Sequence, residues 1–123
     1  MKQLAESASY IIFHEYETVF LKIKNTAGFS VIGDFYGDPE FAVISENEKF
    51  CVMGGAGIIV YFLHEPFEEY QYNTHSAQWK EWGRGQNSDD TIWVTNAVFI
   101  DDRTIEIETE DMQKHTVDVY SLP

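Results

Sequence analysis

The sequence predicts a mostly β protein, a single domain whose short antiparallel strands follow one another as a meander and form a sandwich or a barrel-like sheet. Three observations carry this prediction. Segments rich in Val, Ile, Phe, Tyr and Thr recur roughly every dozen residues, Gly, Asn and Asp interrupt them, and helical periodicity is weak. The connections are too short for crossover helices, so neighbouring strands are expected to pair antiparallel.

The expected strands are taken here in chain order. In the first half of the chain, alternation predicts strands at Tyr10–His14, Thr18–Lys24, Phe29–Phe35, Phe41–Ser45, Phe50–Met53 and Ile58–His64. In the second half, it predicts strands at Glu68–Tyr72, Gln78–Trp82, Thr91–Ile100, Thr104–Thr109 and His115–Tyr120. The N-terminal residues before the first of these strands are expected to form at most a short helix.

Two turns anchor the middle of this meander. The polar segment Ser45–Lys49 separates FAVI from FCVM, and the segment Gly54–Gly57 separates FCVM from IIVYFL, which predicts consecutive hairpins. IIVYFL is apolar throughout, as in a strand covered on both faces, although a buried helix has the same composition. The glycine-rich turn lacks the lysine and helix of a phosphate-binding loop, and positive φ angles explain it better. The polar stretch Gly83–Asp90 is predicted to be the most mobile loop.

The charge of the chain argues against several functions. Its 123 residues include 21 Asp and Glu against 8 Lys and Arg, a net charge of −13 at pH 7, and the basic residues are scattered. Repulsion from phosphate groups disfavours nucleic acid and anionic membranes as partners. No apolar run approaches the roughly 18 residues of a membrane-spanning helix. With 44% hydrophobic and 15% aromatic residues, the chain is expected to fold as one domain over residues 1–123.

The N-terminal residues and the cysteine content both fit a cytoplasmic protein. MKQLAESASY has no basic stretch followed by an apolar one, so a secretory signal is not expected. Cys51 is the single cysteine, which excludes an internal disulfide and fits a reducing compartment. We interpret Cys51 as a small buried side chain rather than a reactive thiol.

Motifs of catalysis or metal binding are not found in the sequence. The four histidines lie far apart, without the spacing of a helical zinc site. Asp34, Asp38 and Glu40 cluster without forming a calcium-loop pattern, and Asp38 before Pro39 is explained as a turn residue. No nucleophile motif and no nucleotide-binding fingerprint is present. We therefore expect a protein that is not an enzyme and uses no cofactor or metal.

The acidic residues gather in the second half of the chain. Residues 1–62 carry 8 acids and 4 bases (8 − 4, net −4), whereas residues 63–123 carry 13 acids and 4 bases (13 − 4, net −9). In the expected strand Thr104–Thr109, alternation places both isoleucines on the core face. The opposite face, with its expected hairpin partner, then carries Glu106, Glu108, Glu110, Thr116 and Asp118. We expect almost no cation beside these carboxylates.

Two explanations of this acidic surface stay open. It is either a solvated face that prevents edge-to-edge aggregation or a surface complementary to a basic protein. Aromatic side chains in or beside the acidic half favour the second explanation, because aromatic residues commonly anchor interfaces. Trp93 is assigned to the core, whereas core and surface stay open for Trp79 and Trp82. The predicted partner-binding residues are Glu106, Glu108, Glu110, Asp118, Trp79, Trp82, Tyr70 and Tyr72.

The segment Ile32–Tyr70 carries a resemblance to a known class of proteins. It contains GDFYGDP at Gly33–Pro39, the turn Cys51–Gly57 and EPF at Glu65–Phe67, and it covers about a third of the chain. It resembles a segment of the small acidic immunity proteins of bacterial polymorphic toxin systems, including contact-dependent growth inhibition. The resemblance implies a cytoplasmic protein that binds the effector domain of its cognate toxin and blocks its active site or an essential surface. It transfers no binding residue to this sequence.

Three functional hypotheses follow from the sequence. The first is an inhibitor of a basic toxin domain such as a nuclease, whose substrate-binding surface an acidic protein can cover. The second is a small-molecule-binding β-barrel with tyrosines and tryptophans lining a cavity. The third is a hydrolase or isomerase, which requires a carboxylate of raised pKa in a cleft. The sequence leaves the identity of the toxin, the strand order and the oligomeric state open.

Overall fold

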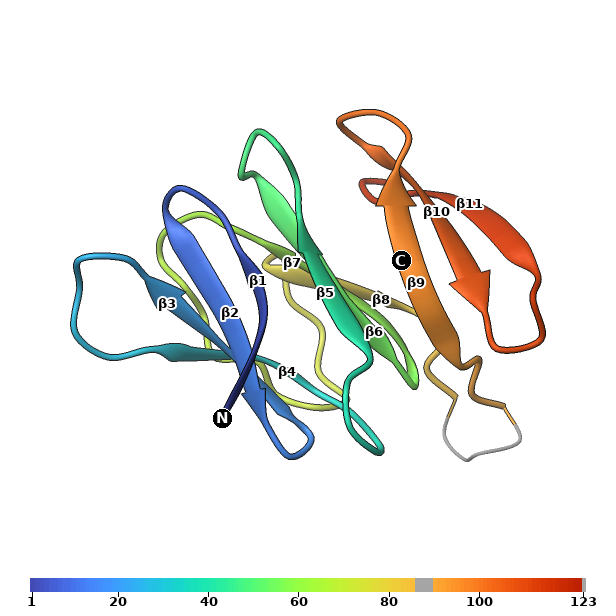
Figure 1. Cartoon of the computed structure of the whole chain (residues 1–123), viewed down its shortest axis with the longest axis horizontal. Coiled ribbons are helices and arrows are strands. Elements are labelled where there is room, and N and C mark those ends of the chain that lie inside the picture. Colours follow the sequence, from blue (N-terminus) through green and yellow to red (C-terminus); the bar gives the residue numbers. More distant parts are fainter. Residues whose placement is uncertain (86–89, 123) are drawn as a thin grey trace.

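The protein folds into three antiparallel β-sheets (Figure 1). The computed structural model describes residues 1–85 and 90–122. These ranges form eleven strands and no helix, and no sheet in them closes into a barrel. The predicted fold class is thereby confirmed in its sandwich form. No helix in the described ranges is long and apolar enough to cross a membrane.

Each sheet is a meander in which strands adjacent in the chain are adjacent in the sheet. The first sheet contains β1 (Lys2–Glu6), β2 (Tyr10–Glu15), β3 (Thr18–Ile23) and β4 (Ser30–Asp34). The second sheet contains β5 (Phe41–Ile44), β6 (Phe50–Gly55), β7 (Gly57–Phe62) and β8 (Trp79–Trp82). The third sheet contains β9 (Val94–Phe99), β10 (Thr104–Thr109) and β11 (Lys114–Asp118).

The second sheet lies between the other two (Figure 1). Every residue of β6 and β7 is buried, because alternate side chains of these strands point into opposite layers. The paired residues Met53 and Ile59 pack toward the first sheet. The paired residues Val52 and Val60 pack toward the third sheet. The prediction that IIVYFL belongs to a strand covered on both faces is confirmed.

The hairpin between β6 and β7 turns at a single residue. Gly55 pairs with Gly57, and Ala56 lies between them. Gly57 has a φ of 78°, and a Cβ atom at this position would lie 2.8 Å from the carbonyl oxygens of Trp82 and Gly83. Positive φ and close packing together require glycine at position 57. Positive φ was also expected for Gly54 and Gly55, and they do not have it.

The N-terminal segment forms a strand and not the short helix that was allowed for it. Ala5 of β1 pairs with Ile12 of β2, and Leu4 packs against the core. The segment lacks clear alternation, and its pairing with β2 determines its conformation. Such a pairing depends on residues elsewhere in the chain and overrides a weak local preference.

The segment Glu68–Tyr72 is not the strand that alternation predicted. It lies along the edge of β4, where the Tyr70 amide donates to the Val31 carbonyl oxygen over 2.9 Å and the Val31 amide donates to Glu69 Oε2 over 2.9 Å. These isolated hydrogen bonds do not continue along the segment, so Glu68–Tyr72 does not add a strand to the first sheet. In the predicted loop Gly83–Asp90, residues 86–89 lie outside the described ranges.

Arg84 joins the ends of the first two sheets. Its side chain is 9% exposed. The guanidinium donates to the carbonyl oxygens of Ala56 over 2.9 Å and Asp34 over 2.6 Å, and its Cζ lies 4.6 Å from the centroid of the Phe35 ring. Nε makes no hydrogen bond and lies 3.5 Å from Glu81 Oε2, an ion-pair distance. Arg84 therefore holds β4 and the β6–β7 turn together while Glu81 balances its charge.

Replacement of Arg84 tests this junction. Arg84→Ala is expected to lower the free energy of unfolding by about 2–4 kcal/mol, because two carbonyl oxygens lose their donor and Glu81 loses its counter-charge. Arg84→Lys should recover only part of the loss, since an ammonium group does not reproduce the guanidinium fork. Urea denaturation measures both changes. Wild-type stability in Arg84→Ala would contradict the role of Arg84 as a junction.

The burial of Cys51 gives a second test. Burial raises the pKa of the thiol to about 12. A cysteine in the unfolded chain has a pKa of about 8.5, so above that pH the unfolded state binds fewer protons than the folded state. Stability should therefore fall as pH rises above 9, by up to about 1.4 kcal/mol per pH unit from this one thiol. Denaturation at pH 8, 9 and 10 should show a smaller fall in Cys51→Ala, and equal slopes would contradict the burial effect.

Candidate functional site

The outer face of the third sheet carries the carboxylates that alternation predicted. Ile105 and Ile107 of β10 are fully buried against the second sheet, so Glu106 and Glu108 point away from the core. In the pairing of β10 with β11, Asp118 lies opposite Thr104 and so shares this face. We call the surface formed by Glu106, Glu108 and Asp118, with Lys114 and Thr116 between them, the acidic face.

Glu110 lies just beyond the end of β10. It is exposed in the turn that leads to β11, and its amide donates to the Trp93 carbonyl oxygen over 2.8 Å. With Trp93 and Asp111 it lines a cleft at the end of the sheet. Glu110 therefore extends the negative charge around the end of the acidic face rather than along the strand.

Two cations lie among these carboxylates, which corrects the expectation of almost none. Arg103 approaches Asp118 Oδ2 with Nε at 2.9 Å and Nη2 at 2.8 Å. Lys114 Nζ lies 3.8 Å from Glu106 Oε1. The antiparallel register brings both pairs together, so the local sequence pattern does not reveal them. Glu108 has no ion-pair partner among the described residues.

The acidic face stays negative despite these pairs. Residues 94–122 contain 7 acids and 2 bases (7 − 2, net −5). The hydrogen bond from Arg103 lowers the pKa of Asp118, and hydrogen bonds from the backbone amides of Arg103 and Thr104 lower the pKa of Asp101. Both carboxyls therefore stay ionised to lower pH than usual.

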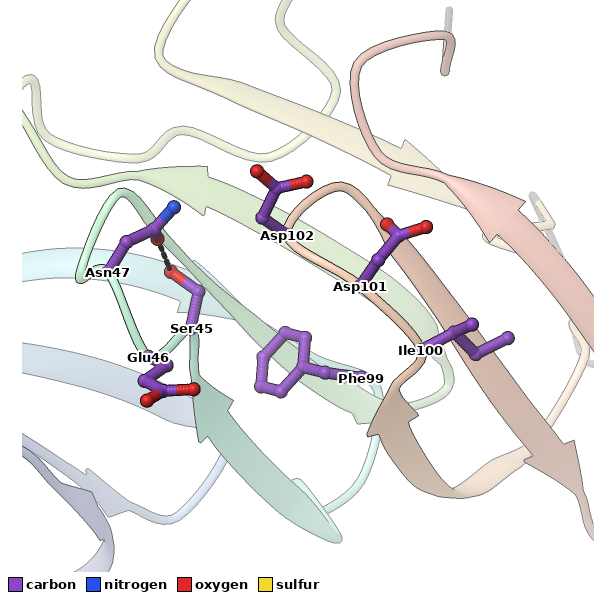
Figure 2. A pocket seen from close by; sticks show the side chains of 7 residues that line it. All are labelled: Ser45, Glu46, Asn47, Phe99, Ile100, Asp101 and Asp102. Carbon is purple, nitrogen blue, oxygen red and sulfur yellow. Dashed lines mark hydrogen bonds between the residues drawn. The ribbon is translucent and has the colours of Figure 1, made fainter.

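A cleft of about 630 Å³ opens between the β5–β6 turn and the β9–β10 turn (Figure 2). Phe99 projects from β9 toward the β5–β6 turn, while Asp101 and Asp102 stand on the neighbouring turn (Figure 2). The lining residues are Ser45, Glu46, Asn47, Phe99, Ile100, Asp101 and Asp102. Three carboxylates therefore border an apolar wall. The turn between β9 and β10 connects this cleft to the acidic face, because β10 begins two residues after Asp102.

Exposed apolar side chains that were not among the predicted partner-binding residues accompany the carboxylates. Val98, Ile100 and Tyr120 are all exposed. Val98 lies opposite Glu106 in the pairing of β9 with β10, and Arg103 Cζ lies 5.3 Å from the centroid of the Tyr120 ring. The alternation of β9 indicates that Val98 points outward, because its neighbours Ala97 and Phe99 point toward the core.

Two of the predicted aromatic anchors are core residues. Trp79 and Tyr70 are buried between the first and second sheets, with ring centroids 5.1 Å apart. Trp79 also stacks with Tyr61, whose ring centroid is 6.4 Å away. The second sheet separates both residues from the acidic face. The prediction that Trp79 and Tyr70 share a surface with Glu106 is therefore wrong, because alternation does not show which layer covers a strand.

The other aromatic residues also lie away from the acidic face. Trp82 is half-buried at the end of β8 and packs on the core between the second and third sheets, with its ring 5.2 Å from that of His115. Tyr72 is exposed in the connection between β7 and β8. Trp93, assigned to the core, is only half-buried and lies beside Tyr36. Trp82 touches the third sheet through His115, and Trp93 touches its end through the hydrogen bond from the Glu110 amide.

The ligand-binding and enzyme hypotheses require an aromatic cavity and a cleft carboxylate of raised pKa, respectively. The clefts of about 630 and 740 Å³ contain one Phe and one Trp, respectively, whereas a cleft of about 480 Å³ has a wall of Phe62, Leu63 and Tyr120. Burial, together with the nearby Glu17 carboxylate, raises the pKa of Asp34, but Asp34 lines none of these clefts. Within the described ranges, no three His, Cys, Asp or Glu side chains converge to hold a metal ion.

Comparison with known proteins gives a likeness of fold. No family model and no curated protein matches the chain. A solved structure with a similar fold is the crystal structure of the Chaetomium thermophilum heterotrimeric Nup82 NTD–Nup159 TAIL–Nup145N APD complex, with a TM-score of 0.69 and 13% sequence identity. The match covers 96% of this chain and 26% of the other chain, so this chain spans about a quarter of that length. At this identity the likeness concerns the fold alone.

The pair between Arg103 and Asp118 gives a test of the electrostatics. Arg103→Gln is expected to raise the pKa of Asp118 toward its ordinary value, because the hydrogen bond from Arg103 is the largest cause of its lowering. The stability that the pair provides is present at neutral pH and lost as pH falls through the lowered pKa. NMR titration of the Asp118 carboxyl measures the change, with Lys114→Gln as control. An unchanged pKa in Arg103→Gln would show that the pair does not form in solution.

Proposed function

We propose that this chain is an immunity protein that binds a basic toxin effector domain through its acidic face and so neutralises the toxin in the cytoplasm. The observation that carries the proposal is the gathering of carboxylates and exposed apolar side chains on one sheet. Glu106, Glu108 and Asp118 share the acidic face, and Asp101 and Asp102 continue the charge to the neighbouring cleft.

The charge of this region is suited to attracting a basic protein. A net charge of −5 over residues 94–122 creates a field that extends about 8–10 Å at physiological salt. Such a field speeds the encounter with a basic partner and rejects acidic proteins. The two cations of the region lie beside Asp118 and Glu106, which leaves Glu108 and the turn carboxylates to meet the charges of the partner.

Exposed apolar groups provide the second requirement of a tight interface. Charge mainly increases the association rate and the specificity for a partner, whereas a few desolvated apolar or aromatic side chains supply most of the affinity. Val98 lies beside Glu106 of the acidic face, and Ile100 lines the cleft that adjoins this face. Tyr120, beside Arg103, offers an aromatic ring at the other border. These three residues replace Trp79 and Tyr70 as the proposed anchors.

The role of inhibitor rests on charge and on the resemblance of Ile32–Tyr70 to immunity proteins. Toxin domains that attack nucleic acid need a basic surface, and an acidic sheet that covers this surface excludes the substrate. The resembling segment begins in β4 and ends in the β7–β8 connection, and its turn Cys51–Gly57 is buried. The resemblance therefore concerns the framework, while the acidic face lies outside it and would select the partner.

Charge reversal tests the proposal. The partner is first captured with the tagged chain from its native host, at low and then at high salt. Glu106→Lys combined with Glu108→Lys is expected to weaken binding of that partner about ten- to hundredfold, because attraction becomes repulsion at the centre of the interface. Calorimetry at low salt measures the affinity. Partner binding that is unaffected by the reversal would contradict the proposal.

A matched control separates the acidic face from total charge. Glu15 and Glu40 are exposed outside the third sheet, and Glu15→Lys with Glu40→Lys changes the net charge by the same amount, from −13 to −9 (2 × 2 = 4). This control variant should bind the partner within about threefold of wild type, because screening weakens distant charges. An equal loss in both variants would point to a general charge effect and against the acidic face.

A further inference from the structure

The outer face of the first sheet carries an aromatic cluster of two half-buried rings and one exposed ring. Ile12 and Leu21 are buried against the second sheet, so their neighbours Phe13 and Phe20 point outward. Phe13 and Phe20 lie opposite one another on β2 and β3 with ring centroids 5.5 Å apart. Phe29 stands edge-on to both rings, with centroids 5.5 and 5.2 Å away, and is 53% exposed. We call this surface the phenylalanine face.

The phenylalanine face is nearly neutral in a strongly acidic protein. Residues 2–34, which form the first sheet, carry 4 acids and 3 bases (4 − 3, net −1), against −5 over residues 94–122. Across the sheet, Glu6 lies opposite Ile11, and Ile11 lies opposite Lys22. This row therefore has a carboxylate at one end, an apolar residue in the middle and an ammonium group at the other end.

We propose that two copies of this chain associate through the phenylalanine face. A molecule of charge −13 repels its own copy, and this repulsion is weakest where the local charge is near zero. Interface centres are enriched in aromatic residues, as the centre of this face is. Pairing through the acidic face would instead desolvate Glu106, Glu108 and Asp118 against like charges, which is unfavourable.

The register across the first sheet fits a two-fold symmetric pair. A two-fold axis along β2 places the Phe13 rings of the two copies against each other. The same axis places Glu6 of one copy opposite Lys22 of the other, twice per dimer, so the row that crosses the sheet is self-complementary. Two sheets packed face to face in this way keep their strands roughly aligned.

The small size of the face predicts a weak association. Four strands about 4.8 Å apart and about five residues long give a face of roughly 19 by 17 Å. This is smaller than the roughly 800 Å² per partner of a standard stable interface. We therefore expect a reversible dimer with a dissociation constant in the micromolar range.

Sedimentation equilibrium of the full chain tests the dimer. Between about 1 and 200 μM, the mass is expected to rise from 14.2 kDa toward 28.4 kDa (2 × 14.2). Phe29→Glu should weaken association at least tenfold. Tyr72→Glu is the control, because Tyr72 is similarly exposed, at 59%, and lies outside the first sheet. A wild-type chain that stays monomeric at 200 μM, or a dimer that Phe29→Glu leaves intact, would overturn the proposal.

A charge swap tests the arrangement within the dimer. Lys22→Glu and Glu6→Lys should each weaken self-association, because each places like charges opposite one another. Mixing the two variants should restore dimers of one copy of each, since both contacts then join opposite charges. Glu6 also pairs with Lys24 within the chain at 2.6 Å, and recovery on mixing distinguishes the contact between copies from loss of this pair. No recovery on mixing would overturn the proposed register. None of these tests requires the toxin.

Discussion

Burial of the β6–β7 hairpin on both faces is the constraint on which the rest of the structure depends. An apolar hairpin of this kind needs a cover on each side, because either face left in water would expose a row of large apolar groups. The first sheet covers one face and the third sheet covers the other. The inner faces of both covering sheets are therefore buried against the second sheet. Their outer faces are the broad surfaces that remain for partners.

These two outer faces differ in the distance over which they act. The acidic face carries charge, and its field reaches a partner before contact is made. The phenylalanine face acts only at contact, because dispersion and dehydration need touching surfaces. Under the two proposals made above, one molecule binds a basic partner on the third sheet and pairs with its own copy on the first. The second sheet keeps the two surfaces on opposite sides of the molecule (Figure 1).

The alternation and apolar runs within single strands predicted which way side chains point and which strand is covered on both faces. The alternation of β10 placed Glu106 and Glu108 outward, and the uniformly apolar β7 was expected to be covered twice. Contacts between distant segments decided the rest. Pairing with β2 turned β1 into a strand, and the stacking order of the sheets buried Trp79 away from the acidic face. The ion pair of Arg103 with Asp118 also depends on register, which alternation within one strand does not encode.

Amide hydrogen exchange of the chain, alone and in complex with its captured basic partner, tests the central claim most directly. Exchange reports protection segment by segment, so it separates the acidic face from every other surface. The account predicts slower exchange on partner binding in β10, in β11 and in the turn that contains Asp101 and Asp102. Protection confined to the first sheet or to the β7–β8 connection, with β10 and β11 unchanged, would contradict it.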